Sequence, residues 1–274
     1  MKGKRKDGPP RVGCTIPSVL AQLQVGAPVW IDDGVIGARV TARTEDGVLL
    51  EIEQAPPDGK KIRTDKGLNF PDTDLEVAPL TAKDREDLAF VVRHADMIGY
   101  SFVQSAADVE LLQDDLARPL PADRAVPALV LKIETRRAVR HLPEIIVQAA
   151  SYLPTAVMIA RGDLAVEVGY ERLTEIQEEI LWLCEAAHVP VIWATQVLEW
   201  LAKEGVPSRA EMSDVALADY AECVMLNKGP YIVEAVRLLD DVLLRMQAHQ
   251  HKKSPQLRAL RSWQELFSAA DQSS

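Results

Sequence analysis

The spacing of apolar residues changes near residue 78 and divides the chain into two parts. Short strand-like apolar runs lie before this point, at 29–31, 35–41 and 48–53. Asp-Gly pairs separate or follow them, at 33–34, 46–47 and 58–59. Because such pairs accept positive φ, they favour tight hairpin turns. We therefore predict a small antiparallel β module over residues 11–77, closed as a Greek key or barrel.

After residue 78, helical spacing of apolar residues alternates with continuous apolar runs. The helical segments are 82–94, 106–116, 171–187, 213–220 and 231–247. The continuous runs are 97–102, 128–133, 156–160, 189–194 and 223–226. Thr81 is the expected N-cap of the first helix. Buried strands bounded by helices predict a parallel sheet covered by helices.

Composition excludes several classes of function. The chain has 31 Lys and Arg against 41 Asp and Glu, a net charge of −10, so we expect no nucleic-acid partner. No apolar run approaches the ~20 residues that span a bilayer, and the basic N-terminus lacks the apolar segment of a secretory signal. The three cysteines are too widely spaced for a disulfide framework or a metal clip. We expect a cytoplasmic protein without a membrane partner.

Polar residues follow several of the predicted strands. Lys132 and Glu134 are two apart on one strand and therefore project to the same face. Gly162 and Asp163 follow the next strand, and Thr195 follows the one after. In β/α barrels this end of the strands carries the chemistry. The sequence therefore predicts a site at the carboxyl ends of these strands.

These residue types suit phosphoryl chemistry assisted by a metal. Two carboxylates, Glu134 and Asp163, suit Mg²⁺ or Mn²⁺, which take oxygen ligands and keep positions for water and substrate. Lys132 would neutralise charge on a transferring phosphoryl group. Gly162 lets the backbone approach an anionic ligand closely, and the Thr195 hydroxyl would relay a proton.

Each of these residues also has a purely structural interpretation. Glu134 can form an ion pair with Lys132 or Arg136, and such networks imitate functional sites. Gly162 can serve a strand-to-helix turn, and Thr195 can cap the helix that it precedes. The residue types alone leave both interpretations open.

Several blocks of the chain, in order, resemble the pyruvate kinase family. They are Val-Leu-Lys-Ile-Glu at 130–134, Met-Ile-Ala-Arg-Gly-Asp-Leu-Ala-Val-Glu at 158–167, Pro-Val-Ile-Trp-Ala-Thr-Gln-Val-Leu at 190–198, and the segments 207–211 and 213–216. Earlier segments resemble the small domain of that family and its return to the barrel, at 29–34, 66–71 and 80–88. The resemblance covers about residues 7–246.

The resemblance implies an α/β fold, a partial (β/α)8 barrel of the TIM type with a small inserted β-barrel lid. Residues 11–77 would form the lid, residues 78–248 the barrel strands four to eight, and residues 249–274 a polar tail. The family transfers phosphate from phosphoenolpyruvate to ADP in glycolysis, giving pyruvate and ATP. It uses Mg²⁺ or Mn²⁺ together with K⁺.

Carried over residue by residue, the family roles fall on the residues already selected. Lys132 would stabilise the transferring phosphoryl group, and Glu134 and Asp163 would hold the divalent metal. Gly162 and Asp163 would contact the substrate carboxylate through their backbone. Thr195 would lie near the methylene carbon that is protonated. Lys132 and Thr195 are thus the expected catalytic residues.

The chain also departs from the family pattern. The first barrel strands, with the arginine that grips phosphate and the K⁺ ligands, have no counterpart, and neither does the C-terminal domain. Asn-Lys-Gly-Pro-Tyr at 227–231 stands where the family has a Ser-Gly-Glu stretch. We therefore expect a divergent form of the family, which is a fragment of a longer protein or is impaired by truncation. We also expect it to self-associate or to form homo-oligomers through open strand edges.

Two other functions stay open. One is a metal-dependent aldolase or lyase that acts on a pyruvate enolate, which would not need the β module at 11–77. The other is a non-catalytic binding protein that keeps the barrel surface.

Overall fold

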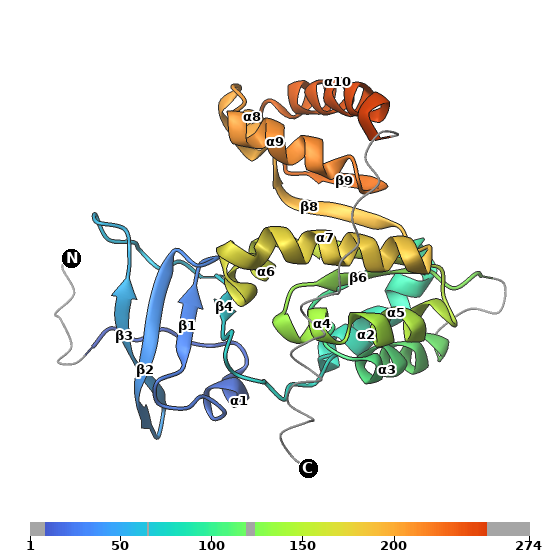
Figure 1. The fold of residues 1–274 in the computed structure, drawn as a ribbon. Coiled ribbons are helices and arrows are strands. Elements are labelled where there is room, and N and C mark those ends of the chain that lie inside the picture. Colours follow the sequence, from blue (N-terminus) through green and yellow to red (C-terminus); the bar gives the residue numbers. More distant parts are fainter. Residues whose placement is uncertain (1–8, 65, 119–123, 251–274) are drawn as a thin grey trace, which may run out of the picture.

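A computed structural model describes residues 9–64, 66–118 and 124–250 (Figure 1). An antiparallel sheet, called here the small sheet, lies beside a larger layered α/β part. The polar tail predicted over 249–274 lies outside the described residues from 251 onward.

The small sheet is built from the hairpins that the Asp-Gly pairs predict. Its elements are α1 (Pro17–Leu20), β1 (Pro28–Ile31), β2 (Ile36–Thr44), β3 (Gly47–Gln54) and β4 (Leu68–Asn69). The turn at 32–35 joins β1 to β2, and Thr44 pairs with Gly47 across the next turn. Two of the three predicted hairpins are thus confirmed, and the third is wrong, because the pair at 58–59 lies in a turn that joins no hairpin-paired strands in the described residues.

The predicted closure of this sheet into a barrel is wrong for the described residues. The strand order is β3-β2-β1-β4, so β3 and β4 are edges that do not pair. The physical reason is that β4 has only two residues, which pair with Trp30 and Ile31 of β1. The sheet covers a small core that includes Val29, Ile36 and Phe70.

The larger part consists of five parallel strands and their connecting helices. The strands are β5 (Met97–Tyr100), β6 (Ala128–Ile133), β7 (Thr155–Ala160), β8 (Val191–Val197) and β9 (Cys223–Leu226). The longer helices are α2 (Ala82–His94), α3 (Ala106–Ala117), α5 (Leu142–Ala150), α7 (Tyr170–Ala187), α9 (Arg209–Ala218) and α10 (Ile232–Gln250). The short helices are α4 (Arg136–Arg140), α6 (Arg161–Val168) and α8 (Glu199–Glu204). The predicted parallel sheet is confirmed.

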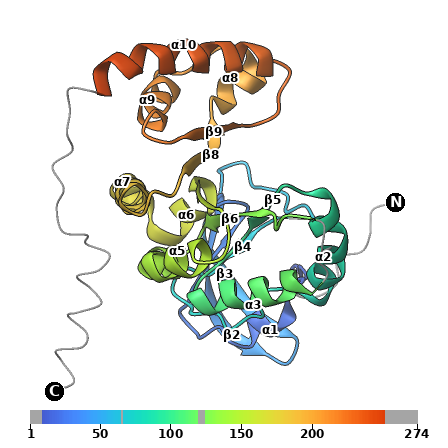
Figure 2. The same cartoon turned by 90° about the vertical axis from the view of Figure 1, so that its right-hand side faces the viewer.

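The strands pair in sequence order, β5-β6-β7-β8-β9, so β5 and β9 are the edges and the described residues do not close a barrel. The middle strands are apolar on both faces, and Leu129, Leu131, Ile159 and Trp193 are almost completely buried. Figure 2 shows α2, α3 and α5 arranged around β5 and β6, with α8, α9 and α10 grouped beside β9. Helices therefore cover this sheet, as parallel strands require.

Several helix boundaries depend on caps that the sequence carries. Thr81 caps α2 as predicted, and it forms a reciprocal capping box with Asp84. The helix predicted over 213–220 begins earlier, at Arg209, because Ser208 and Glu211 form another capping box. Among the described residues, no helix is both long and apolar enough to cross a membrane.

Candidate active site

Lys132 and Glu134 lie together at the carboxyl end of β6, as their spacing predicts. The Lys132 Nζ is 2.9 Å from the Glu134 Oε1 and donates to the Ser101 Oγ at 2.6 Å. The other carboxylate oxygen of Glu134 accepts a hydrogen bond from the backbone N–H of Phe102. Glu134 is only 2% exposed. The loop after β5 and the end of β6 therefore fix this pair jointly.

Burial sets the electrostatics of this pair. It raises the pKa of Glu134, whereas the hydrogen bond and charge of Lys132 and the Phe102 N–H oppose the rise, and the charge of Asp163 adds to it. The ion pair with Lys132 that the structural interpretation predicted is present. A buried carboxylate of this kind favours cationic neighbours.

Gly162 and Asp163 lie in the first turn of α6, which begins directly after β7. The Gly162 N–H donates to the Thr195 Oγ1 at 2.9 Å, so the ends of β7 and β8 are joined at this point. Thr195 does not cap the following helix, because α8 begins at Glu199 after Leu198. The capping interpretation of Thr195 is therefore wrong.

The end of β8 has an unusual backbone that Arg161 holds in place. Thr195, Gln196 and Leu198 have φ of 65°, 57° and 48°, in the left-handed region. The Arg161 Nε donates to the Ala194 carbonyl oxygen at 2.9 Å, and its Nη2 donates to the Thr195 carbonyl oxygen.

Two further contacts anchor the Arg161 side chain. Its guanidinium pairs with Asp214 of α9 and lies 4.7 Å from the centre of the Trp193 ring. The sequence analysis selected neither Arg161 nor Asp214. The available signal was an arginine directly after a fully apolar strand, which must find partners when it is buried.

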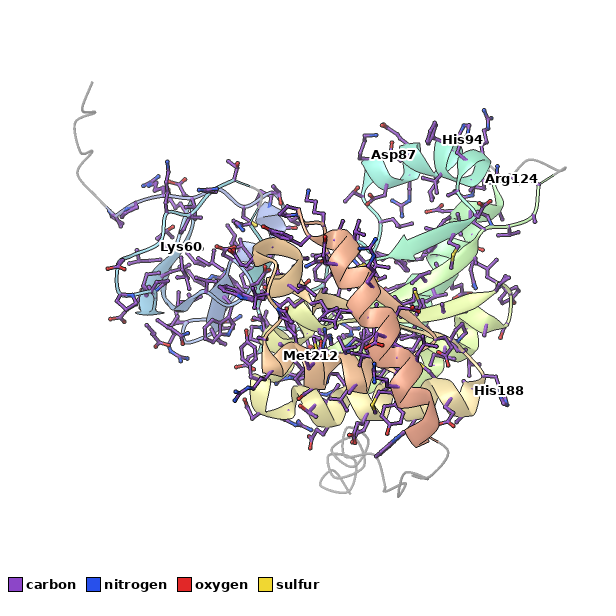
Figure 3. All side chains as sticks on the ribbon, turned by 90° about the horizontal axis from the view of Figure 1, so that it is seen from above. Lys60, Asp87, His94, Arg124, His188 and Met212 are labelled. Carbon is purple, nitrogen blue, oxygen red and sulfur yellow. The ribbon has the colours of Figure 1, made fainter. Side chains whose placement is uncertain are left out.

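The small sheet reaches the site through Asn69 of β4. The Asn69 Nδ2 donates to the Asp163 Oδ1 at 3.4 Å, and β4 lies next to α6 (Figure 1). Burial raises the pKa of Asp33, and the charges of Asp163 and Asp32 raise it further. Asp32 is held by Lys66 at 2.5 Å and by Lys60 at 3.4 Å. Seen from above, Lys60 lies on the small sheet, away from Met212 (Figure 3).

A cavity of about 1460 Å³ lies beside the site, between the small sheet and the parallel sheet. Its walls include Asn69, Ser101, Asp163 and Glu167. Of the site residues predicted from sequence, only Asp163 lines it. The cavity therefore borders the candidate site at one carboxylate and does not enclose Lys132 or Thr195.

The donor atoms fit a divalent cation with oxygen ligands. Glu134 and Asp163 supply carboxylates from neighbouring strand ends, and the buried Asn69 Oδ1 has no hydrogen-bond partner in the structure. Within the described ranges, no group of three or more His, Cys, Asp or Glu side chains could hold a metal. Two carboxylates leave several coordination positions for other oxygens, as Mg²⁺ sites usually do.

A parallel sheet with a lysine, two carboxylates and a threonine at its strand ends is typical of β/α enzymes that act on anionic substrates. Comparison with known proteins identifies the family. Residues 3–236 match the family model described as the pyruvate kinase barrel domain. The chain belongs to the pyruvate kinase family.

Three relatives illustrate the extent of the similarity. A pyruvate kinase of Agrobacterium vitis is 38% identical over 233 residues, which cover 82% of this chain and 45% of the relative. A pyruvate kinase of Geobacillus stearothermophilus is 36% identical over 252 residues, 89% of this chain and 41% of the relative. Pyruvate kinase PKLR of Rattus norvegicus is 36% identical over 223 residues, 79% and 37%. The chain therefore spans less than half the length of these relatives.

Proposed function

We propose that this chain carries the phosphoryl-transfer site of a pyruvate kinase-type enzyme, which converts phosphoenolpyruvate and ADP to pyruvate and ATP in glycolysis. The observation that carries the proposal is the ion pair of Lys132 with the buried Glu134, 2.9 Å apart at the end of β6. Membership of the pyruvate kinase family supports the same reaction. We further propose that residues 11–77 act as a lid over a barrel part, 78–248, in the cytoplasm.

In this mechanism Lys132 faces the transferring phosphoryl group. Ser101 and Glu134 hold its ammonium in one position, so the charge is in place before the reaction and needs no reorganisation. Glu134 and Asp163 would hold the divalent cation. When bound, Mg²⁺ or Mn²⁺ would neutralise and orient substrate oxygens.

Thr195 is suited to moving a proton. Its Oγ1 already accepts a hydrogen bond from the Gly162 N–H, which leaves the hydroxyl proton available for a second partner. That proton would pass to the methylene carbon of the enolate as pyruvate forms, and solvent water would return a proton to the Thr195 Oγ1. Arg161 supports this role because it binds the Thr195 carbonyl oxygen and fixes the backbone that carries the hydroxyl.

The contact between Asn69 and Asp163 favours the kinase over an enolate lyase. A lyase would not need the small sheet at its site, whereas an enzyme that binds phosphoenolpyruvate and a nucleotide uses a lid to exclude water. The lyase and the non-catalytic binding protein are therefore outcomes of the test.

The test measures pyruvate formation from phosphoenolpyruvate, ADP and Mg²⁺ with a coupled lactate dehydrogenase assay. In Lys132→Ala we expect the rate to fall roughly 100- to 1000-fold, since one preorganised charge in such a site contributes about 3–4 kcal/mol. Lys203→Ala, which removes an exposed lysine paired with Glu199, is the matched control and should keep the parent rate.

The other outcomes discriminate between the functions. Equal rates in parent and Lys132→Ala would remove Lys132 from the mechanism. No rate in either protein would favour the binding protein, and pyruvate release from an aldol adduct without ADP would favour the lyase.

Cation binding is tested separately with Mn²⁺, followed by water-proton relaxation. We expect weak binding that tightens when oxalate is added, because the free coordination positions accept its oxygens. Glu134→Gln should bind Mn²⁺ more weakly. If the variant binds as tightly as the parent, Glu134 is not a ligand.

A further inference from the structure

Asn69 is a buried residue of β4, and only one of the two polar atoms of its side-chain amide has a hydrogen-bond partner among the described residues. The residue is 5% exposed, and its Nδ2 donates to the Asp163 Oδ1 at 3.4 Å. Its Oδ1 is buried and has no hydrogen-bond partner among the residues that the structure describes. A buried polar atom without a partner costs roughly 1–3 kcal/mol. The amide therefore has an unused acceptor beside a carboxylate proposed to bind a cation.

We propose that Asn69 is part of the cation site, where its amide oxygen accepts a hydrogen bond from the water shell of the divalent cation that Asp163 binds or coordinates that ion directly, so that cation binding holds the small sheet against the parallel sheet. This inference rests on the proposed metal site. It assigns to β4 a role in cation affinity in addition to its pairing with β1.

The length of the existing contact supports this assignment. A hydrogen bond between an amide N–H and a carboxylate is usually about 2.7–3.2 Å long, so 3.4 Å is a weak contact. A hydrated cation bound by Asp163 would present water hydrogens, or the ion itself, to the unpaired amide oxygen. Both halves of the Asn69 amide would then have partners.

The charges near the contact of Asn69 with Asp163 also favour a cation at this place. Burial raises the pKa of Asp33 of the small sheet, and the charge of Asp163 raises it further, so the two carboxylates lie near enough to repel. Lys66 offsets part of this charge, but its ammonium is already paired with Asp32. A divalent cation between the sheets would relieve the repulsion.

The inference predicts a specific order of Mn²⁺ affinities among variants. Asn69→Ala should bind Mn²⁺ roughly 10-fold more weakly, because partners around a metal ligand typically contribute 10- to 100-fold to affinity. Asn69→Asp loses the amide donor but keeps an oxygen and gains a charge, so it should bind Mn²⁺ at least as tightly as the parent. A merely structural Asn69, needed only to donate to Asp163, would make Asn69→Asp as weak as Asn69→Ala or weaker.

The matched control is Gln22→Ala. The Gln22 amide makes three hydrogen bonds, one to the Ser18 carbonyl oxygen at 3.3 Å and two with the backbone of Glu76 at 3.0 Å and 2.7 Å. It belongs to the same part of the chain but does not contact Asp163. We expect the parent Mn²⁺ affinity in this variant.

The experiment combines Mn²⁺ titration by water-proton relaxation with hydrogen exchange of the segment 66–72. In the parent, Mn²⁺ should slow exchange in this segment, and in Asn69→Ala it should not. Circular dichroism shows whether each variant is folded. If Asn69→Ala does not fold, the Mn²⁺ affinity of Asn69→Asp relative to the parent tests the inference. Parent-like affinity in Asn69→Ala, or Asn69→Asp no tighter than Asn69→Ala, overturns the inference. If Glu134→Gln still lowers the affinity in that case, the proposed metal site survives. No Mn²⁺ binding by the parent overturns both.

Discussion

Glu167→Gln should stabilise the protein at alkaline pH and leave its stability almost unchanged at acid pH. Glu167 lies in α6 and is 9% exposed. Burial raises the pKa of its carboxyl to about 7, the charges of Asp163 and Asp72 add to the rise, and Arg136 opposes it. Glutamine has nearly the same shape as the protonated side chain and does not ionise.

The sign and size of the effect follow from the two pKa values. The unfolded chain releases this proton near pH 4.5, whereas the folded protein keeps it until about pH 7. Between these values the folded state binds more protons, so stability falls as the pH rises through the window. A rise in pKa from 4.5 to about 7 corresponds to a loss of about 3 kcal/mol above pH 7. Glutamine avoids this loss.

Urea unfolding of parent and variant, followed by circular dichroism at pH 5, 6, 7 and 8, measures the difference in unfolding free energy. We expect a difference of about 1 kcal/mol at pH 5 that grows to about 3 kcal/mol at pH 8, the latter being roughly 6–12 °C in Tm. Glu86→Gln, at an exposed glutamate of α2, should give the same difference at every pH. A Glu167→Gln difference that does not change with pH would refute the reasoning.

Three further predictions follow. Arg161→Met should lower the unfolding free energy by about 3–5 kcal/mol, because it leaves Asp214 and two backbone carbonyls without their buried cation; a loss below about 1 kcal/mol in urea unfolding would show that Arg161 does not hold β8. Thr81→Ala should cost about 1 kcal/mol through loss of the α2 cap, and an unchanged urea midpoint would contradict this. The free edge of β5, where Met97 is 56% exposed, should make the protein self-associate; light-scattering chromatography that shows one species of the 30.2 kDa chain mass would contradict this expectation.

Long apolar runs were the most predictable part of the fold. β6 and β9 have the predicted bounds, since both are largely apolar segments that a polar residue follows, Glu134 and Asn227. α2 also has its predicted bounds, because Thr81 provides a local start signal. Where a strand or helix depends on its own residues, sequence reasoning was sufficient.

Short helices that depend on tertiary contacts were not predicted. α6 begins at Arg161 without a side-chain cap and has Gly162 in its first turn, which is unfavourable for a helix. The Gly162 N–H instead bonds to Thr195, 33 residues away. The end of β8 was missed for a similar reason, because its left-handed residues include no glycine to signal the turn.

The residues of the candidate site also differ in how far they could be predicted from sequence. Lys132, Glu134, Gly162, Asp163 and Thr195 were selected because strand ends can be located from sequence. The residues that support them were not selected, since Asn69 contacts Asp163 across 94 positions and Arg161 contacts Asp214 across 53. No local pattern reports such contacts, so a sequence locates candidate residues at strand ends before it locates the residues that contact them.

The distribution of charge explains why a cation and the small sheet should depend on each other at this site. The Lys132 ammonium is paired with Glu134 at 2.9 Å. The small sheet places Asp33 near Asp163, where burial and then the charge of Asp163 raise the pKa of Asp33, so a cation between them would relieve the repulsion. Among the described residues, the small sheet donates a single hydrogen bond to Asp163, the 3.4 Å contact of Asn69. If cation binding strengthens the contact of the small sheet with α6, that contact must equally strengthen cation binding. The reason is that the coupling between these two equilibria is reciprocal. Substitutions that weaken the contact of the small sheet with α6 should therefore lower cation affinity even when they leave Glu134 and Asp163 in place.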